Sequence, residues 1–110
     1  MKIPNQVRIA GVQWSVLMSS AVDKVLDADK RLGLAVFDTS EIYLKSHGRS
    51  QEAIWEVFLH ELVHIVLHNA GQTQMILKED DVEEAIVESL GCGLFQIFHD
   101  NGMLSVEEEV

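Results

Sequence analysis

The 110-residue sequence has a single cysteine, a single proline and no long apolar run. Because Cys92 is alone, no intramolecular disulfide can form, which is typical of a protein from a reducing compartment. No segment approaches the ~20 consecutive apolar residues that a membrane span needs. No apolar stretch follows Lys2, as it would in a signal peptide. We therefore expect a cytoplasmic protein with no membrane partner.

Basic residues are also scarce, since 8 Lys and Arg stand against 18 Asp and Glu, for a net charge of −10 with neutral histidines. The few basic residues are scattered along the chain, whereas nucleic-acid binders concentrate positive charge on one surface. We therefore expect no nucleic-acid partner. Apolar residues make up 47% of the chain, and glycines number only seven, so the composition is that of a folded domain rather than a linker.

The first half of the chain has the alternating pattern of strands. Apolar and polar residues alternate over 12–18, which predicts a strand. Two further strands are predicted at 33–37 and 40–45, joined by a turn. Between the first strand and this pair, the polar segment 20–31 is compatible with a short helix, capped at Ser20, or with a loop.

The second half has the helical period. Ser50 is a good N-cap for a helix over 51–69, with Gly71 as its stop. A second helix is predicted over 81–99, with Asp80 and Glu83 forming a capping box at its start and Asp100 to Gly102 ending it.

This order of elements, strands first and then two long helices, predicts an α+β fold. We expect one domain over 1–110, with a small N-terminal antiparallel sheet packed on a central helix and on a second, C-terminal helix. The acidic stretch 103–110 is expected to be a frayed tail.

The helix over 51–69 is apolar on most of its circumference, which predicts a central, buried helix. One stripe at a spacing of four is nevertheless polar, and polar groups on a buried helix need partners. The stripe consists of Glu52, Glu56, His60, His64 and His68.

The sequence His60-Glu61-Leu62-Val63-His64 within this helix is an HExxH motif. Residues four apart lie on one helical face, so both imidazoles can reach one zinc ion. Glu61 follows the first histidine, where its carboxylate can deprotonate a water molecule that the ion activates. The alternative is a buried helix whose histidines are hydrogen-bonded to other protein groups.

A catalytic zinc site needs a third protein ligand. His68 lies about 12 Å from His60 along a helix, which is too far for one ion and suggests a cleft residue. The second helix offers Glu84, which we favour because the first helix lacks a third ligand, and Glu88 as the reserve. Gly91 lies on the same face and would let the two helices approach closely.

Several other residues have chemistry that the sequence cannot place. Cys92 is a conceivable soft ligand, but we expect it to pack between the helices as a small apolar group. Tyr43, His47 and His99 could each stabilise an oxyanion.

The segments HELVHIVLH and, about twenty residues later, EEAIVESLG resemble zincin metallopeptidases of the glutamate-ligand type, and more closely the small ImmA/IrrE-like and phage-encoded HExxH proteins. The resemblance implies zinc on His60, His64 and Glu84, with Glu61 as the general base, and hydrolysis of a peptide or protein substrate. It also implies that the strand near 41–45 pairs with an extended substrate.

Two alternatives remain. The first is a non-catalytic zinc-binding or protein-interaction module of phage type. The second is suggested by residues 63–71, which resemble part of the three-histidine motif of YbeY-type metal-dependent endoribonucleases. That motif would place a third histidine at position 74, which is Gln74, and a glycine at position 65, which is Ile65.

Overall fold

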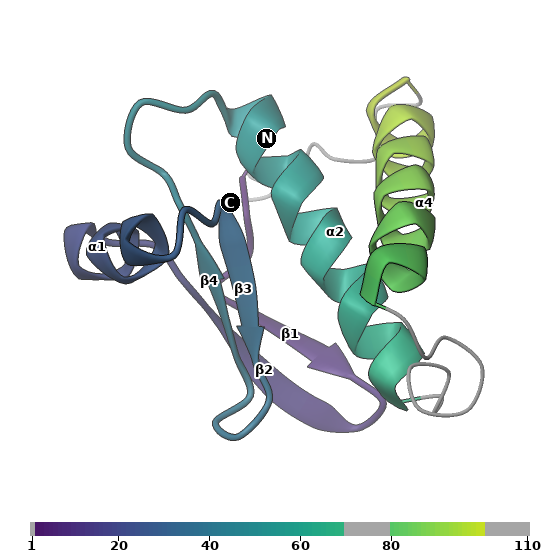
Figure 1. Ribbon diagram of the computed structural model, residues 1–110, viewed down its shortest axis with the longest axis horizontal. Helices are drawn as coiled ribbons and strands as arrows, with labels where there is room; N and C mark the ends of the chain where they lie inside the picture. Colours follow the sequence, from purple (N-terminus) through teal and green to yellow (C-terminus); the bar gives the residue numbers. More distant parts are fainter. Residues whose placement is uncertain (1, 70–79, 101–110) are drawn as a thin grey trace.

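The computed structural model describes residues 2–69 and 80–100, and for residues 80–82 and 96–100 it describes the backbone alone. The fold is α+β, as predicted (Figure 1). In chain order the elements are β1 (Gln6–Ile9), β2 (Val12–Leu17), α1 (Ser20–Ala28), β3 (Gly33–Val36), β4 (Glu41–Leu44), α2 (Gln51–Asn69) and α4 (Asp80–Asp100).

The four strands form one sheet in the order β1-β2-β4-β3. The β1–β2 and β3–β4 pairs are antiparallel, but β2 and β4 are parallel, with Val16 opposite Ile42. The prediction of a purely antiparallel sheet was therefore wrong. The physical reason is the connection between these strands: α1 carries the chain from β2 to the outer strand β3, which then runs back, so that β4 enters between them parallel to β2.

Strand β1 was not predicted, although its residues alternate between exposed and half-buried. It pairs with β2 through a two-residue turn at Ala10 and Gly11, which have φ angles of 51° and 82°. Positive φ at both positions is the type I′ geometry that matches the twist of a hairpin. The strongest sequence signals for this turn, Asn-Gly and Asp-Gly, are missing here, so the hairpin escaped notice.

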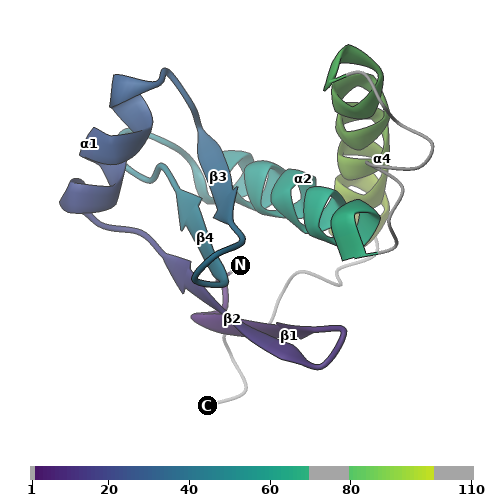
Figure 2. The same ribbon diagram turned by 60° about the horizontal axis from the view of Figure 1, so that its bottom comes forward.

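Helix α2 lies centrally, between the sheet and α4, while α1 lies on the opposite side of β3 and β4 (Figures 1 and 2). The core forms where the inner face of the sheet meets α2. It is built from Ile3, Trp14, Val16, Ile42, Leu44, Ile54, Trp55, Phe58 and Ile65. Helix α2 is not buried all round, however, because Val66 is 55% exposed.

Side-chain caps fix where the helices begin. Ser50 accepts a hydrogen bond from the backbone N–H of Ala53, as predicted for the start of α2. Helix α1 is capped by Ser19 rather than by the predicted Ser20, through a 3.1 Å bond from the N–H of Val22. The buried carboxylate of Asp23 in α1 has a further role, because it accepts the backbone N–H groups of residues 46 and 47 and so holds the loop that leads into α2.

The predicted stop at Gly71, the capping box at Asp80, the ending at residues 100–102 and the tail over 103–110 lie outside the residues or side chains that the structure describes. Within the described segments, no helix is both long and apolar enough to cross a bilayer.

Candidate metal centre

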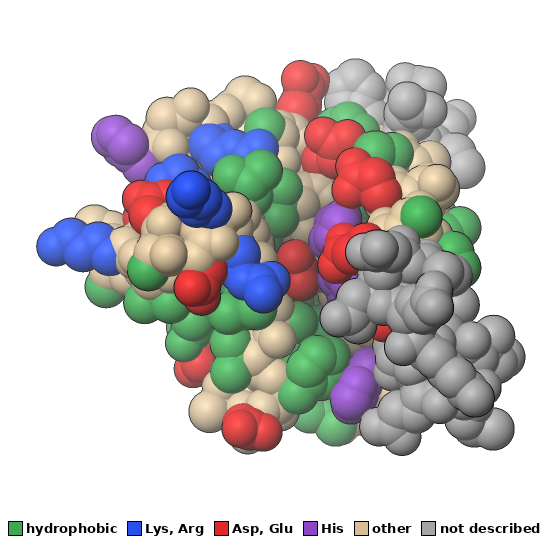
Figure 3. Space-filling view, viewed as in Figure 1, with side chains coloured by type: hydrophobic (Ala, Val, Ile, Leu, Met, Phe, Trp, Pro, Cys, Tyr) green, Lys and Arg blue, Asp and Glu red, His purple; other side chains and the backbone are tan. Residues whose placement is uncertain are grey.

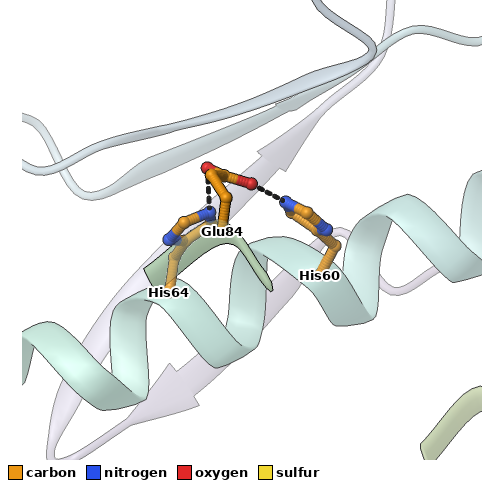
Figure 4. Close-up of side chains that lie close together, drawn as sticks. All are labelled: His60, His64 and Glu84. Atoms are coloured by element: carbon orange, nitrogen blue, oxygen red, sulfur yellow. Dashed lines mark ion pairs between the residues drawn. The ribbon is translucent and has the colours of Figure 1, made fainter. Parts of the chain in front are cut away.

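Three side chains from two helices meet above the middle of α2 (Figure 4). His60 and His64 lie one turn apart on α2, and Glu84 reaches them from α4. One carboxylate oxygen of Glu84 is 3.4 Å from His60 Nε2, and the other is 3.1 Å from His64 Nε2. The three donor atoms lie within 4.8 Å of one another, so the group could hold a metal ion. Two imidazoles with one carboxylate form a donor set that suits zinc.

A second layer of carboxylates holds the other nitrogen of each imidazole. His60 Nδ1 lies 3.1 Å from Glu88 Oε1, and His64 Nδ1 lies 2.8 Å from Glu83 Oε2. Metal-binding histidines usually donate their second N–H to such a partner, which fixes the ring and its tautomer. This arrangement directs both Nε2 atoms toward Glu84 and leaves Glu88 on the far side of the His60 ring.

The role of Glu83 was missed, because the sequence assigned this residue to a helix cap. Its side chain is only 17% exposed and lies on the His64 ring. A signal was available in the neighbouring acids Glu83, Glu84 and Glu88, since a carboxylate is one of the usual partners for the second N–H of a metal-binding histidine.

Gly91 explains how α4 comes so close to α2. A Cβ atom at this position would lie 3.3 Å from the Cα atom of His60, which is tighter than an ordinary van der Waals contact. The expectation that Gly91 permits close helix packing is confirmed. The absence of a side chain here lets Glu84 and Glu88, on the preceding turns, reach the histidine rings.

Glu61 packs under strand β3. It is only 7% exposed, and a Cβ atom at Gly33 would lie 3.2 Å from its Oε2 atom. Burial raises the pKa of the Glu61 carboxyl above its ordinary value, and the charge of Glu84 adds to this effect, while His64, His60 and Arg31 oppose it. A carboxyl group with a raised pKa is better suited to both accepting and donating a proton.

His68 is not part of the cluster. It lines the same cleft, and its ring lies 4.1 Å from the ring of Phe37, measured between centroids. Of the described oxyanion candidates, Tyr43 donates a hydrogen bond to Glu41 in the sheet, and His47 is exposed in the loop before α2. Neither lines the cleft. The side chain of His99 lies outside the described residues.

Cys92 does not pack as a small apolar group, contrary to expectation. Its thiol donates to Glu56 Oε2 at 3.2 Å and to Glu88 Oε2 at 3.4 Å. The hydrogen bond to Glu56, with burial and the bond to Glu88, raises the pKa of the Cys92 thiol to about 11. The thiol is therefore protonated at neutral pH and is a poor nucleophile.

We expect alkylation of Cys92 at pH 8 to be about 100-fold slower in the folded protein than in urea. The reason is that raising the thiol pKa from 9.0 to about 11 lowers the thiolate fraction by that factor. The rate should climb as the pH approaches 11, and it can be followed by mass spectrometry with iodoacetamide. Glu56→Gln should speed the reaction by lowering the pKa. Equal rates in the folded and unfolded chains would contradict this assignment.

The cluster opens into a cleft of about 590 Å³ between β3 and α4. Gly33, Leu34, Ala35 and Phe37 form the wall on the sheet side. In Figure 3, the histidine atoms near the middle of the view lie between acidic side chains on the α4 side and basic side chains on the side of the sheet and α1.

Strand β3 is an edge of the sheet, whereas β4 is paired on both sides. The prediction that the strand near 41–45 pairs with an extended substrate was therefore wrong, because that strand has no free edge. Topology explains the error, since the hairpin places the earlier strand outermost.

No protein-family model matches this chain, and no curated protein or solved structure is significantly similar to it.

Proposed function

We propose that this protein is a zinc-dependent metallopeptidase. His60, His64 and Glu84 would hold the ion, and Glu61 would act as the general base. The observation that carries the proposal is the layered cluster, in which both Nε2 atoms converge on Glu84 while separate carboxylates hold both Nδ1 atoms. A purely structural ion would need none of the adjoining cleft or the buried acid beside it.

The chain's own residues would supply the metal ligands and the proton carrier that hydrolysis requires. A bound zinc ion supplies a Lewis acid that lowers the pKa of water and polarises a carbonyl group. The Glu61 carboxylate accepts a proton from the attacking water and later delivers a proton to the leaving amine, so that the hydroxyl joins the carbonyl carbon as the C–N bond breaks. Its raised pKa suits both directions of proton transfer.

The substrate would lie along strand β3. The residues of this strand line the cleft, and its outer edge has no partner among the described strands. An extended peptide could add to this edge through main-chain hydrogen bonds, which would carry its backbone past the histidine pair.

The proposal is tested with purified protein and a mixture of peptides followed by mass spectrometry. We expect hydrolysis of peptide bonds in the presence of zinc, loss of hydrolysis after chelation, and recovery when zinc is returned. His60→Ala should be inactive under all three conditions. Hydrolysis that persists after complete metal removal would contradict the proposal.

A further inference from the structure

Two arginines lie on the wall of the cleft. Arg31 stands just before β3, and Arg49 stands in the loop before α2. The N–H of Lys45 donates to the carbonyl of Leu32 at 3.0 Å, so the end of β4, four residues before Arg49, lies beside the residue that follows Arg31. Among the described residues that line the cleft, these two are the only Lys or Arg.

Neither guanidinium has an ion-pair partner within the described part of the chain. No carboxylate there forms an ion pair with Arg31 or Arg49. Arg49 Nη1 is shielded from solvent and has no hydrogen-bond acceptor. A buried N–H without an acceptor is costly, and a guanidinium is best satisfied by the two oxygens of a carboxylate or a phosphate.

The opposite wall has the opposite charge. Glu56, Glu84 and Glu88 line the cleft on the side of the helices. Figure 3 shows acidic side chains gathered on the α4 side. An anionic group on a ligand would be repelled by this wall and attracted to the arginines. The cleft therefore favours a negatively charged ligand group beside the two arginines.

The arginines lie close to the proposed reaction centre. Arg31 is near enough to Glu61 to oppose the rise of its pKa. Along α2, the helix start beside Arg49 is about 14 Å from His60 at 1.5 Å per residue. An extended peptide covers about 3.3 Å per residue, so about four residues span this length.

We propose that Arg31 and Arg49 form a carboxylate-binding subsite on the wall of the cleft. Its ligand is a peptide carboxylate, from an acidic side chain or from the C-terminus, within about four residues of the bond at the histidine pair. The inference rests on the proposed function for the identity of the ligand as a substrate. The subsite itself needs only the two arginines.

The test uses calorimetric titration of the Glu61→Gln protein with zinc, so that the probes are not cleaved. Three hexapeptides of alanine and glycine serve as probes. The first is capped at both ends and contains one glutamate, the second has a free C-terminal carboxylate, and the third is capped and neutral. We expect at least one carboxylate probe to bind about tenfold more tightly than the neutral one. The tighter of the two identifies the source of the carboxylate.

Adding Arg31→Gln or Arg49→Gln should weaken the carboxylate probe about tenfold and leave the neutral probe unchanged. Lys24→Gln removes the same charge from α1 outside the cleft and should change neither affinity. Equal binding of all probes, no binding of any probe, or equal weakening of all probes by the arginine variants would overturn the subsite.

Zinc content is measured on the same samples to separate the two proposals. If the protein binds zinc but shows no preference for carboxylate probes, the subsite is refuted and the proposed function stands. If the protein binds no zinc, the proposed function is refuted. A preference for carboxylate probes that depends on the arginines would still support the subsite in that case.

Discussion

Glu61→Gln is expected to lower peptide hydrolysis about 10³-fold while the zinc content stays at the wild-type level. Removal of a general base commonly costs 10²- to 10⁴-fold in rate. The substitution keeps the shape of a side chain that is packed beneath β3, so the fold should survive. The measurement compares kcat/KM for a cleaved peptide with zinc per chain in the same preparation.

Glu56→Gln is the matched control for this experiment. It makes the same change on the same helix, and Glu56 also lines the cleft, but its carboxylate accepts from Cys92 and is not part of the histidine cluster. We expect this variant to retain most of the activity. A Glu61→Gln protein as active as the wild type would show that Glu61 is not the base.

Zinc is expected to raise the free energy of unfolding by about 3 kcal/mol when its free concentration is 100 times its dissociation constant. For a chain of this size, such a gain corresponds to a rise in Tm of about 10 °C or more. The expected cause is local, because Glu83, Glu84 and Glu88 converge on two imidazoles and a cation would relieve their mutual repulsion. Thermal unfolding followed by circular dichroism, with zinc and with a chelator, measures the shift.

Variants distinguish the proposed metal ligand Glu84 from the outer carboxylates, which hold the histidine rings. Glu84→Gln should abolish the rise in Tm, because it removes a proposed ligand. Glu83→Gln should keep the rise but require 10- to 100-fold more zinc, which is the usual cost of losing a residue that orients a ligand. A rise of equal size with magnesium, or an undiminished rise in Glu84→Gln, would contradict the assignment.

The parts of the fold that local sequence controls were predicted well. Helix α2 runs over Gln51–Asn69, as expected from the cap at Ser50 and the apolar period. The hairpin of β3 and β4 also follows from alternation and a turn. The parallel pairing of β2 with β4 was not predictable in this way, because it depends on α1 carrying the chain past the position of β4 to the outer strand β3.

The candidate site shows the same division. The spacing of His60 and His64 predicts that they share a face, and the structure brings Glu84 to both of them. The outer positions of Glu83 and Glu88 depend on how two helices pack and on which ring nitrogen each rotamer presents, and neither is encoded by local spacing. The cleft arginines were missed for a similar reason, because they line one cleft only when the end of β4 lies beside the start of β3.

The most direct test of the central claim is the zinc content per chain, measured by elemental analysis for the wild type, His60→Ala, Glu84→Ala and Glu88→Ala. Our account predicts about one zinc ion per chain in the wild type, loss in His60→Ala and Glu84→Ala, and retention with weaker affinity in Glu88→Ala. A wild-type protein that takes up no zinc from excess would contradict the account. Loss of zinc in Glu88→Ala with full retention in Glu84→Ala would also contradict it, because the inner and outer carboxylates would then be reversed.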